Sequence, residues 1–165
     1  MTKTQDNLAA AFAGESQASR KYLAFAKQAD IEGHSQAAKL FRAAAAAETI
    51  HALNHLRALG EIKTSAENLQ AAIEGENYEH MAMYPEFIAE AEAAGDKKAL
   101  KTFRWAMDVE VVHEQLYRKA LECLSVPQDS VDFFVCPFCG FTAEGLAPEV
   151  CPVCGTPGGK FERIF

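Results

Sequence analysis

A glutamate and a histidine three residues apart occur twice in this chain, as Glu48-Thr-Ile-His51 and as Glu110-Val-Val-His113. On an α-helix, a step of three residues returns to the same side, roughly 60° apart around the axis, so each pair directs two metal-ligating groups the same way. Glu110 follows Glu48 by 62 positions. This spacing predicts a helical hairpin that is repeated once.

Three further glutamates complete the pattern. Glu15 lies in the helical stretch before the first pair, and Glu76-Asn-Tyr-Glu79 lies in the stretch before the second, with Glu76 61 positions after Glu15. Each predicted hairpin therefore carries a Glu followed by Glu-x-x-His. Four helices with inward glutamates and two such pairs form the ligand pattern of di-iron carboxylate proteins.

Charge supports a metal at these positions. Taken singly, a helical glutamate is usually solvated, and a histidine on an apolar face is usually a core residue. Five glutamates directed at one core would instead cost several kcal/mol for each unpaired charge, unless cations neutralised them. Carboxylate and imidazole ligands suit iron or manganese, whereas zinc sites take fewer ligands and more nitrogen or sulfur. The residues alone leave iron and manganese open.

Hydrophobic periodicity predicts four long helices and one short one. The long helices are expected over about residues 4–32, 35–59, 76–94 and 97–124, and the short one over about residues 64–73. The chain is therefore expected to be mainly α-helical up to residue 124.

Local signals predict how these helices begin and bend. Ser35 is expected to cap the second helix, and Thr64 with Glu67 resembles a capping box. Gly75 is expected to mark a break or bend. Pro85 is expected to kink the third long helix near its preceding turn, because proline lacks a backbone N–H.

Two cysteine pairs dominate the C-terminal part. Prolines, glycines and cysteines replace alanines after residue 132, and short strands are expected at Phe133–Val135 and Phe161–Ile164. Two Cys-x-x-Cys-Gly turns place four thiolates so that they can bind one ion, at Cys136, Cys139, Cys151 and Cys154. Four thiolates bind either zinc or a single iron, and the spacing does not distinguish them. Cys123 stands apart and is expected to be a plain thiol.

Composition limits the domain organisation and the partners. A chain of 165 residues with 49% hydrophobic residues can bury one sizeable helical core and carry one small appended module. The expected division is a helical domain over residues 1–124, a linker over 125–132 and a cysteine domain over 133–165. The net charge of −7 argues against nucleic acid or an anionic membrane surface as a partner, since both bind basic faces.

The expected compartment is the cytoplasm. The polar N-terminal segment has no apolar region of the kind found in secretory signals, and no apolar run is long enough to span a membrane. Paired cysteines in an unexported chain indicate metal binding rather than disulfides.

Together these motifs resemble the rubrerythrin family over essentially the whole chain. The helical part matches in five segments, Ala13-Gly-Glu15-Ser16, Glu48-Thr-Ile-His51, Glu74-Gly-Glu76-Asn-Tyr-Glu79-His80, Met83-Tyr-Pro85 and Glu110-Val-Val-His113, and the two cysteine turns resemble rubredoxin. The second glutamate of Glu76-x-x-Glu79 separates this pattern from ferritins and bacterioferritins. The implied fold is a ferritin-like four-helix bundle followed by a small rubredoxin-like β module.

The resemblance implies a non-haem di-iron peroxidase that reduces hydrogen peroxide to water and protects cells from oxidative stress. Its cofactors would be two irons in a di-iron-oxo site and one iron in a rubredoxin-type four-cysteine site, which relays electrons from a reductase or a rubredoxin. The family also implies a homodimer, with one subunit's rubredoxin module near the other subunit's di-iron site, and some members exchange helices between subunits.

The resemblance also assigns roles to residues. Glu48 and Glu110 would bridge the irons, and His51 would replace Glu79 as a ligand on reduction. Tyr22 and Tyr84 match tyrosines that the family places near the site. The complete implied ligand set of the diferric site is Glu15, Glu48, Glu76, Glu79, Glu110 and His113, and that of the single iron is Cys136, Cys139, Cys151 and Cys154.

Two other functions are compatible with the motifs. Ferritin-like bundles can act as ferroxidases that oxidise and deliver iron. A non-catalytic adaptor with zinc at the four cysteines is a further possibility. Among the remaining histidines, His55 is expected to support the site from its edge or to be structural, and His34 and His80 are expected to be structural.

Overall fold

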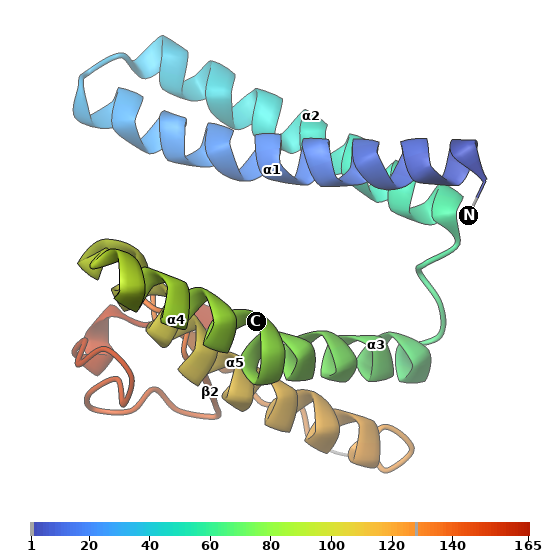
Figure 1. Cartoon of the computed structure of the whole chain (residues 1–165), viewed down its shortest axis with the longest axis vertical. Coiled ribbons are helices and arrows are strands. Elements are labelled where there is room, and N and C mark those ends of the chain that lie inside the picture. The colour runs from blue at the N-terminus through green and yellow to red at the C-terminus, as the bar shows by residue number, and fades with distance from the viewer. Residues whose placement is uncertain (1, 128) are drawn as a thin grey trace. The chain divides into compact units, whose positions relative to one another are not determined.

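The computed structural model describes residues 2–127 and 129–165, and the chain divides into two compact units, Met1–Lys63 and Thr64–Phe165 (Figure 1). Met1 of the predicted helical domain and Gln128 of the predicted linker lie outside the described residues. Each unit contains one of the two helical hairpins that the repeated motif predicted, and the second unit also contains the cysteine module.

The first unit is a hairpin of two long helices, α1 (Lys3–Ile31) and α2 (Ser35–Leu59), that lie side by side (Figure 1). Small side chains line the contact and allow a close approach; the buried ones are Ser19, Ala26, Ala29, Ala38, Ala45 and Ala52. Ser35 is not the cap that was predicted. His34 occupies the cap position without a side-chain hydrogen bond, because the helix already includes Ser35.

The helical part of the second unit consists of α3 (Ser65–Tyr78), a π-helical turn η1 (Glu79–Met83), α4 (Tyr84–Ala94) and α5 (Lys97–Cys123). The capping box of Thr64 and Glu67 is confirmed. The predicted break at Gly75 is wrong, since α3 continues through this glycine.

The π-turn lies where Pro85 was predicted to disturb the helix. The N–H of Tyr84 donates to the carbonyl of Glu79, five residues back instead of four. Pro85 follows in the first turn of α4, where its missing N–H costs least. The disturbance is therefore a widened turn rather than a simple kink.

Aromatic clusters reveal how closely the two hairpins repeat each other. Tyr22, Phe25 and Phe41 pack together in the first unit, and Tyr84, Phe87 and Phe103 pack together in the second. Each aromatic residue of the second cluster follows its counterpart by 62 positions, as Glu110 follows Glu48, whereas Glu76 follows Glu15 by 61. The second hairpin thus has one extra residue between Glu76 and Tyr84, and the π-turn accommodates it.

The cysteine module contains a three-stranded antiparallel sheet in the order β2-β1-β3. Its strands are β1 (Phe133–Val135), β2 (Thr142–Glu144) and β3 (Glu162–Ile164), with a short 3-10 helix η2 (Gly158–Lys160) before β3. The first and last strands agree with the prediction, and β2 was not predicted. The module lies against α5, where a Cβ on Gly140 would meet Val109.

Among the described residues, none of the helices combines the length and the apolar character that a membrane span requires.

The capping box at the start of α3 gives a first prediction. Thr64→Ala removes the side-chain acceptor for the N–H of Glu67, so the free energy of unfolding should fall by roughly 1 kcal/mol. Urea denaturation of the metal-free protein measures this change. Thr102→Ala is the control, because the exposed Thr102 hydroxyl bonds only a carbonyl within its own helix. An equal loss in both variants would contradict the capping role.

Candidate metal centres

The first unit carries a cluster of two carboxylates and one imidazole. Glu15 comes from α1, and Glu48 and His51 come from one face of α2. One ligand atom of each lies within 4.8 Å of the others. The Nδ1 atom of His51 is 2.8 Å from a Glu48 oxygen and 3.9 Å from a Glu15 oxygen. The spacing of three residues on α2 therefore aims both groups at one point, as the sequence predicted.

The second unit repeats this arrangement with Glu76 from α3 and with Glu110 and His113 from α5. The Nδ1 atom of His113 is 2.7 Å from a Glu110 oxygen and 3.9 Å from a Glu76 oxygen. These distances match those of the first unit within 0.1 Å. Ligand atoms this close can share one ion, because metal–ligand bonds of about 2 Å span such a gap.

Burial and mutual repulsion shift the pKa values of the second cluster. Burial, followed by the charge of Glu110, raises the pKa of Glu76 from 4.5 to about 7. A hydrogen bond with Glu110 raises the pKa of His113, although burial opposes this shift. Both groups therefore tend to hold a proton where the carboxylates crowd together, and a metal ion would take the place of that positive charge.

Glu79 belongs to the same environment without being part of the compact cluster. It is the first residue of the π-turn, and burial followed by the charge of Glu110 raises its pKa. Tyr84, at the end of that turn, also has a raised pKa, caused by burial and then by the charges of Glu79 and Glu110. Tyr22, in the first unit, packs on Phe25 and Phe41.

The four cysteines come together in the C-terminal module. All are free thiols, and their sulfurs lie within 4.8 Å of one another. The Sγ–Sγ distance is 3.6 Å for Cys136 and Cys154 and 3.5 Å for Cys139 and Cys151. Sulfurs around a tetrahedral metal at 2.3 Å are about 3.8 Å apart, so the cluster fits one such ion.

Glycines shape the two cysteine turns. Gly140 and Gly155 have φ angles of 86° and 77°, which side-chain-bearing residues rarely adopt. Their N–H groups donate to the carbonyls of Cys136 and Cys151, each at 3.0 Å. Burial raises the pKa of Cys139 and of Cys151. At Cys154 burial is outweighed by hydrogen bonds from Thr156, which lower the pKa to about 6 and favour the thiolate.

A hydrogen-bonded chain connects the cysteine module to the second carboxylate cluster. The hydroxyl of Thr142 donates to the carbonyl of Gly140 at 3.1 Å, and it accepts from Nε2 of His113 at 3.0 Å. With Nε2–H donated to Thr142, Nδ1 is the ring nitrogen that faces Glu110 and Glu76, and in the metal-free protein it donates to a Glu110 oxygen at 2.7 Å. A bound metal would take the place of that proton. Gly140 directly follows Cys139, so the link joins the two candidate metal sites within one unit.

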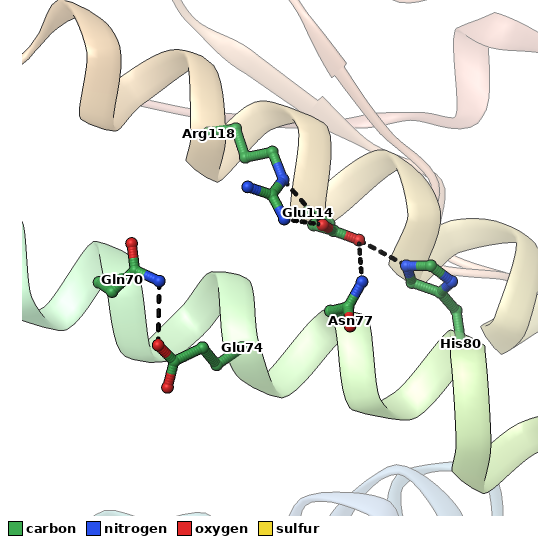
Figure 2. A network of polar contacts seen from close by, with 6 residues as sticks. All are labelled: Gln70, Glu74, Asn77, His80, Glu114 and Arg118. Carbon is green, nitrogen blue, oxygen red and sulfur yellow. Dashed lines mark hydrogen bonds and ion pairs between the residues drawn. The ribbon is translucent and has the colours of Figure 1, made fainter.

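A buried charged network next to this cluster was missed by the sequence analysis (Figure 2). Glu114 is 8% exposed and accepts from Asn77, His80 and Arg118. Hydrogen bonds from His80 and then Arg118 lower its pKa to about 2. Glu114 follows Glu110 by four positions, so helical periodicity could have placed it on the same face of α5 as Glu110.

The other singled-out residues lie outside these clusters. Among the described residues, no metal-ligand cluster includes His55, which is half-buried on α2. Cys123, the last residue of α5, is a half-buried free thiol.

Comparison with known proteins agrees with these sites. The family model for rubrerythrin matches residues 6–121, and the model for the rubredoxin-like domain of rubrerythrin matches residues 134–162. The chain belongs to the rubrerythrin family. The predicted fold class, mainly α with four long helices and a small four-cysteine module, is thereby confirmed, as are the predicted kinds of metal site, a di-iron carboxylate domain and a rubredoxin-like cysteine cluster.

Individual relatives match over nearly the whole chain. Nigerythrin from Nitratidesulfovibrio vulgaris is 38% identical, over 96% of this chain and 85% of that protein. Rubrerythrin-2 from Clostridium acetobutylicum is 34% identical, over 98% of this chain and 96% of that protein. A solved structure of nigerythrin in its fully reduced, all-ferrous state superposes with a TM-score of 0.61 at 36% identity, over 99% of this chain and 88% of that one.

The raised pKa of Glu76 predicts how metal uptake depends on pH. The group is protonated below about pH 7 in the metal-free protein, and a metal binds only its ionised form. Affinity of the carboxylate site for cobalt(II) should therefore rise about tenfold between about pH 6 and pH 8, with release of protons. Titration in a weakly buffered indicator solution measures both quantities.

The raised pKa of Glu76 also determines how the stability of the metal-free protein changes with pH. Because the pKa of Glu76 is higher in the folded protein than its usual 4.5, its ionisation destabilises the metal-free protein as the pH rises from 4.5 to about 7. Glu76→Gln should remove this part of the dependence. An unchanged pH profile of cobalt affinity and of stability in that variant would contradict the assignment.

Proposed function

We propose that this chain is a non-haem di-iron peroxidase that reduces hydrogen peroxide to water and receives its electrons through the four-cysteine site. The observation that carries the proposal is the hydrogen-bonded link from Gly140 through Thr142 to His113. It joins a one-electron metal site to a carboxylate cluster of the type that binds two irons. A docking module with structural zinc would not need this connection.

The proposed ligands follow the family pattern residue by residue. The first unit offers Glu15, Glu48 and His51, and the second offers Glu76, Glu110 and His113. Glu79, on the π-turn in the same environment, is the seventh proposed ligand. In the family pattern both sets serve one di-iron centre, with Glu48 and Glu110 as the bridging pair. Cys136, Cys139, Cys151 and Cys154 are the proposed ligands of the single iron.

Peroxide reduction needs two electrons and two protons for each peroxide, and the irons supply the electron chemistry when bound. The chain's own contribution is to position groups and to hold protons. The raised pKa of Tyr84 keeps its phenol protonated near Glu79, so it can donate a hydrogen bond toward the site. Tyr22 holds the equivalent position in the first hairpin and is proposed to act in the same way.

Glu79 and His51 are proposed to alternate as ligands between the oxidised and reduced states. A carboxylate suits the more highly charged oxidised ions, and neutral imidazole suits the reduced ones. Glu79 begins a π-turn, a geometry that frequently occurs at functional sites.

The proposed partners are hydrogen peroxide and an electron donor, either a reductase or a rubredoxin. The acidic net charge of −7 favours a donor with a basic contact face. A homodimer and a cytoplasmic location remain predictions from the family pattern and from the sequence.

Glu79→Ala tests the proposed chemistry. Loss of a mobile ligand should lower peroxide turnover roughly tenfold or more, while the free energy of unfolding changes by only about 1 kcal/mol. Steady-state peroxide consumption and urea denaturation measure the two effects. Glu74→Ala is the control, because Glu74 lies on the same helical segment and bonds only the exposed Gln70. Native turnover in Glu79→Ala would rule out the proposed role.

Thr142→Val tests the electron path. The variant keeps the shape of the side chain but removes the hydroxyl between Gly140 and His113. Electron transfer to the di-iron site should slow several-fold, which stopped-flow absorption of the ferric-thiolate chromophore measures. Thr102→Val, on the exposed face of α5, should leave the rate unchanged. Equal rates in both variants, with native iron content, would exclude this path.

A further inference from the structure

Glu114 is the one charged side chain that is buried among residues 2–127 and 129–165. It follows the proposed ligand His113 directly, yet its carboxylate is absent from the metal-ligand clusters found in those residues. A buried carboxylate is costly unless hydrogen bonds satisfy it, so its partners indicate what it does.

Four donors surround the Glu114 carboxylate from two helical segments (Figure 2). Nε and one terminal nitrogen of Arg118 bond Oε1 at 2.8 and 2.5 Å. His80 and Asn77 share Oε2, at 2.5 and 3.2 Å. Both oxygens are fully used, and the carboxylate only accepts, so the ring of His80 donates its Nε2–H.

The two cross-helix donors flank Glu79 in the sequence. Asn77 lies in the last turn of α3, and His80 is the second residue of the π-turn. Both side chains point to α5, as Figure 2 shows. The backbone that carries Glu79 is therefore tied to α5 on both sides of this residue, while the Glu79 side chain takes no part in the network.

The first hairpin provides an internal comparison. Counting back 62 positions, Glu114 corresponds to Ala52 and Arg118 to Leu56. Ala52 is buried, and α1 runs from Lys3 to Ile31 without a π-turn. The charged network thus occurs in the hairpin that has the extra residue and Glu79. In the other hairpin, the residues that match Glu114 and Arg118 are apolar.

We infer that Glu114, through His80 and Asn77, is a positioning residue that clamps the π-turn to α5 and so sets where the Glu79 carboxylate meets the metal site. The inference rests on the proposed role of Glu79 as a metal ligand. A widened turn loses regular α-helical hydrogen bonds. His80 in the turn and Asn77 just before it both donate to Glu114 of α5, and these two bonds hold the turn in one register. The backbone stays fixed in this arrangement, and the Glu79 side chain remains free to move.

Hydrogen exchange in the metal-free, full-length protein tests the clamp itself. Glu114→Gln replaces one acceptor by a donor that faces other donors, so amides 79–83 should exchange about tenfold faster or more. Exchange in α1 and α2 should not change. The control is Glu92→Gln, which removes an exposed carboxylate–arginine contact with Arg104 between α4 and α5. Equal exchange of amides 79–83 in Glu114→Gln and wild type would overturn the inference.

Cobalt(II) titration of the full-length protein separates positioning from general stability. Glu114→Gln should weaken cobalt binding at the carboxylate site about tenfold or more, while the four-cysteine site of the same molecule keeps its affinity. A general loss of stability would weaken both sites. The double variant His80→Leu/Glu114→Leu should regain stability through apolar packing but not the affinity of the carboxylate site. Native affinity at that site in the double variant would overturn the inference.

These readouts keep the clamp distinct from the proposed function. If the wild-type protein does not reduce peroxide, the proposed function fails, and the exchange and cobalt results still decide the clamp. If Glu79→Ala binds cobalt as tightly as wild type, Glu79 is not a ligand, and the clamp's link to the metal site is overturned with it.

Discussion

The mutual repulsion of carboxylates on facing helices is the interaction on which this molecule depends. Glu76, Glu110 and Glu79 crowd one region of the second unit, and burial with mutual repulsion raises the pKa values of Glu76 and Glu79. A helical hairpin holds such groups together when protons or cations offset their charge. Metal binding is therefore expected to stabilise the folded chain, and the repeated Glu-x-x-His spacing supplies the candidate ligands.

The two hairpins repeat one pattern, and they differ by one extra residue in the second. The aromatic clusters and the Glu-x-x-His pairs share an offset of 62 residues, whereas Glu76 follows Glu15 by 61. The π-turn, which lies between Glu76 and Tyr84, accommodates the one extra residue. That turn carries Glu79, and the matching positions of the first hairpin, Gln17 and Ala18, have no carboxylate. The same turn brings His80 to Glu114. One inserted residue thus accompanies both an additional carboxylate and the network that holds its backbone.

Much of the candidate site could be predicted from residue spacing, because on a helix or in a tight turn the interval between two residues determines where their side chains point. Glu48 with His51, Glu110 with His113 and the cysteine pairs all lie together as their intervals predicted. The π-turn did not follow, since proline signals only a lost hydrogen bond, although the change of offset from 61 to 62 was visible. Glu114 was not predicted either, because its position one turn after Glu110 gives no sign of its partner His80, which lies on the π-turn of the neighbouring helical segment. The cap at Ser35 failed because a helix can begin one residue early without a side-chain bond.

The proposed function requires peroxide reduction at the carboxylate site to be coupled to the four-cysteine site. The most direct test is to reduce the purified protein anaerobically, add one equivalent of hydrogen peroxide or of oxygen, and follow the ferric-thiolate absorption. Rapid return of colour, faster with peroxide than with oxygen, is the predicted result. Colour that returns only with oxygen, or no colour at any stage, would contradict the account.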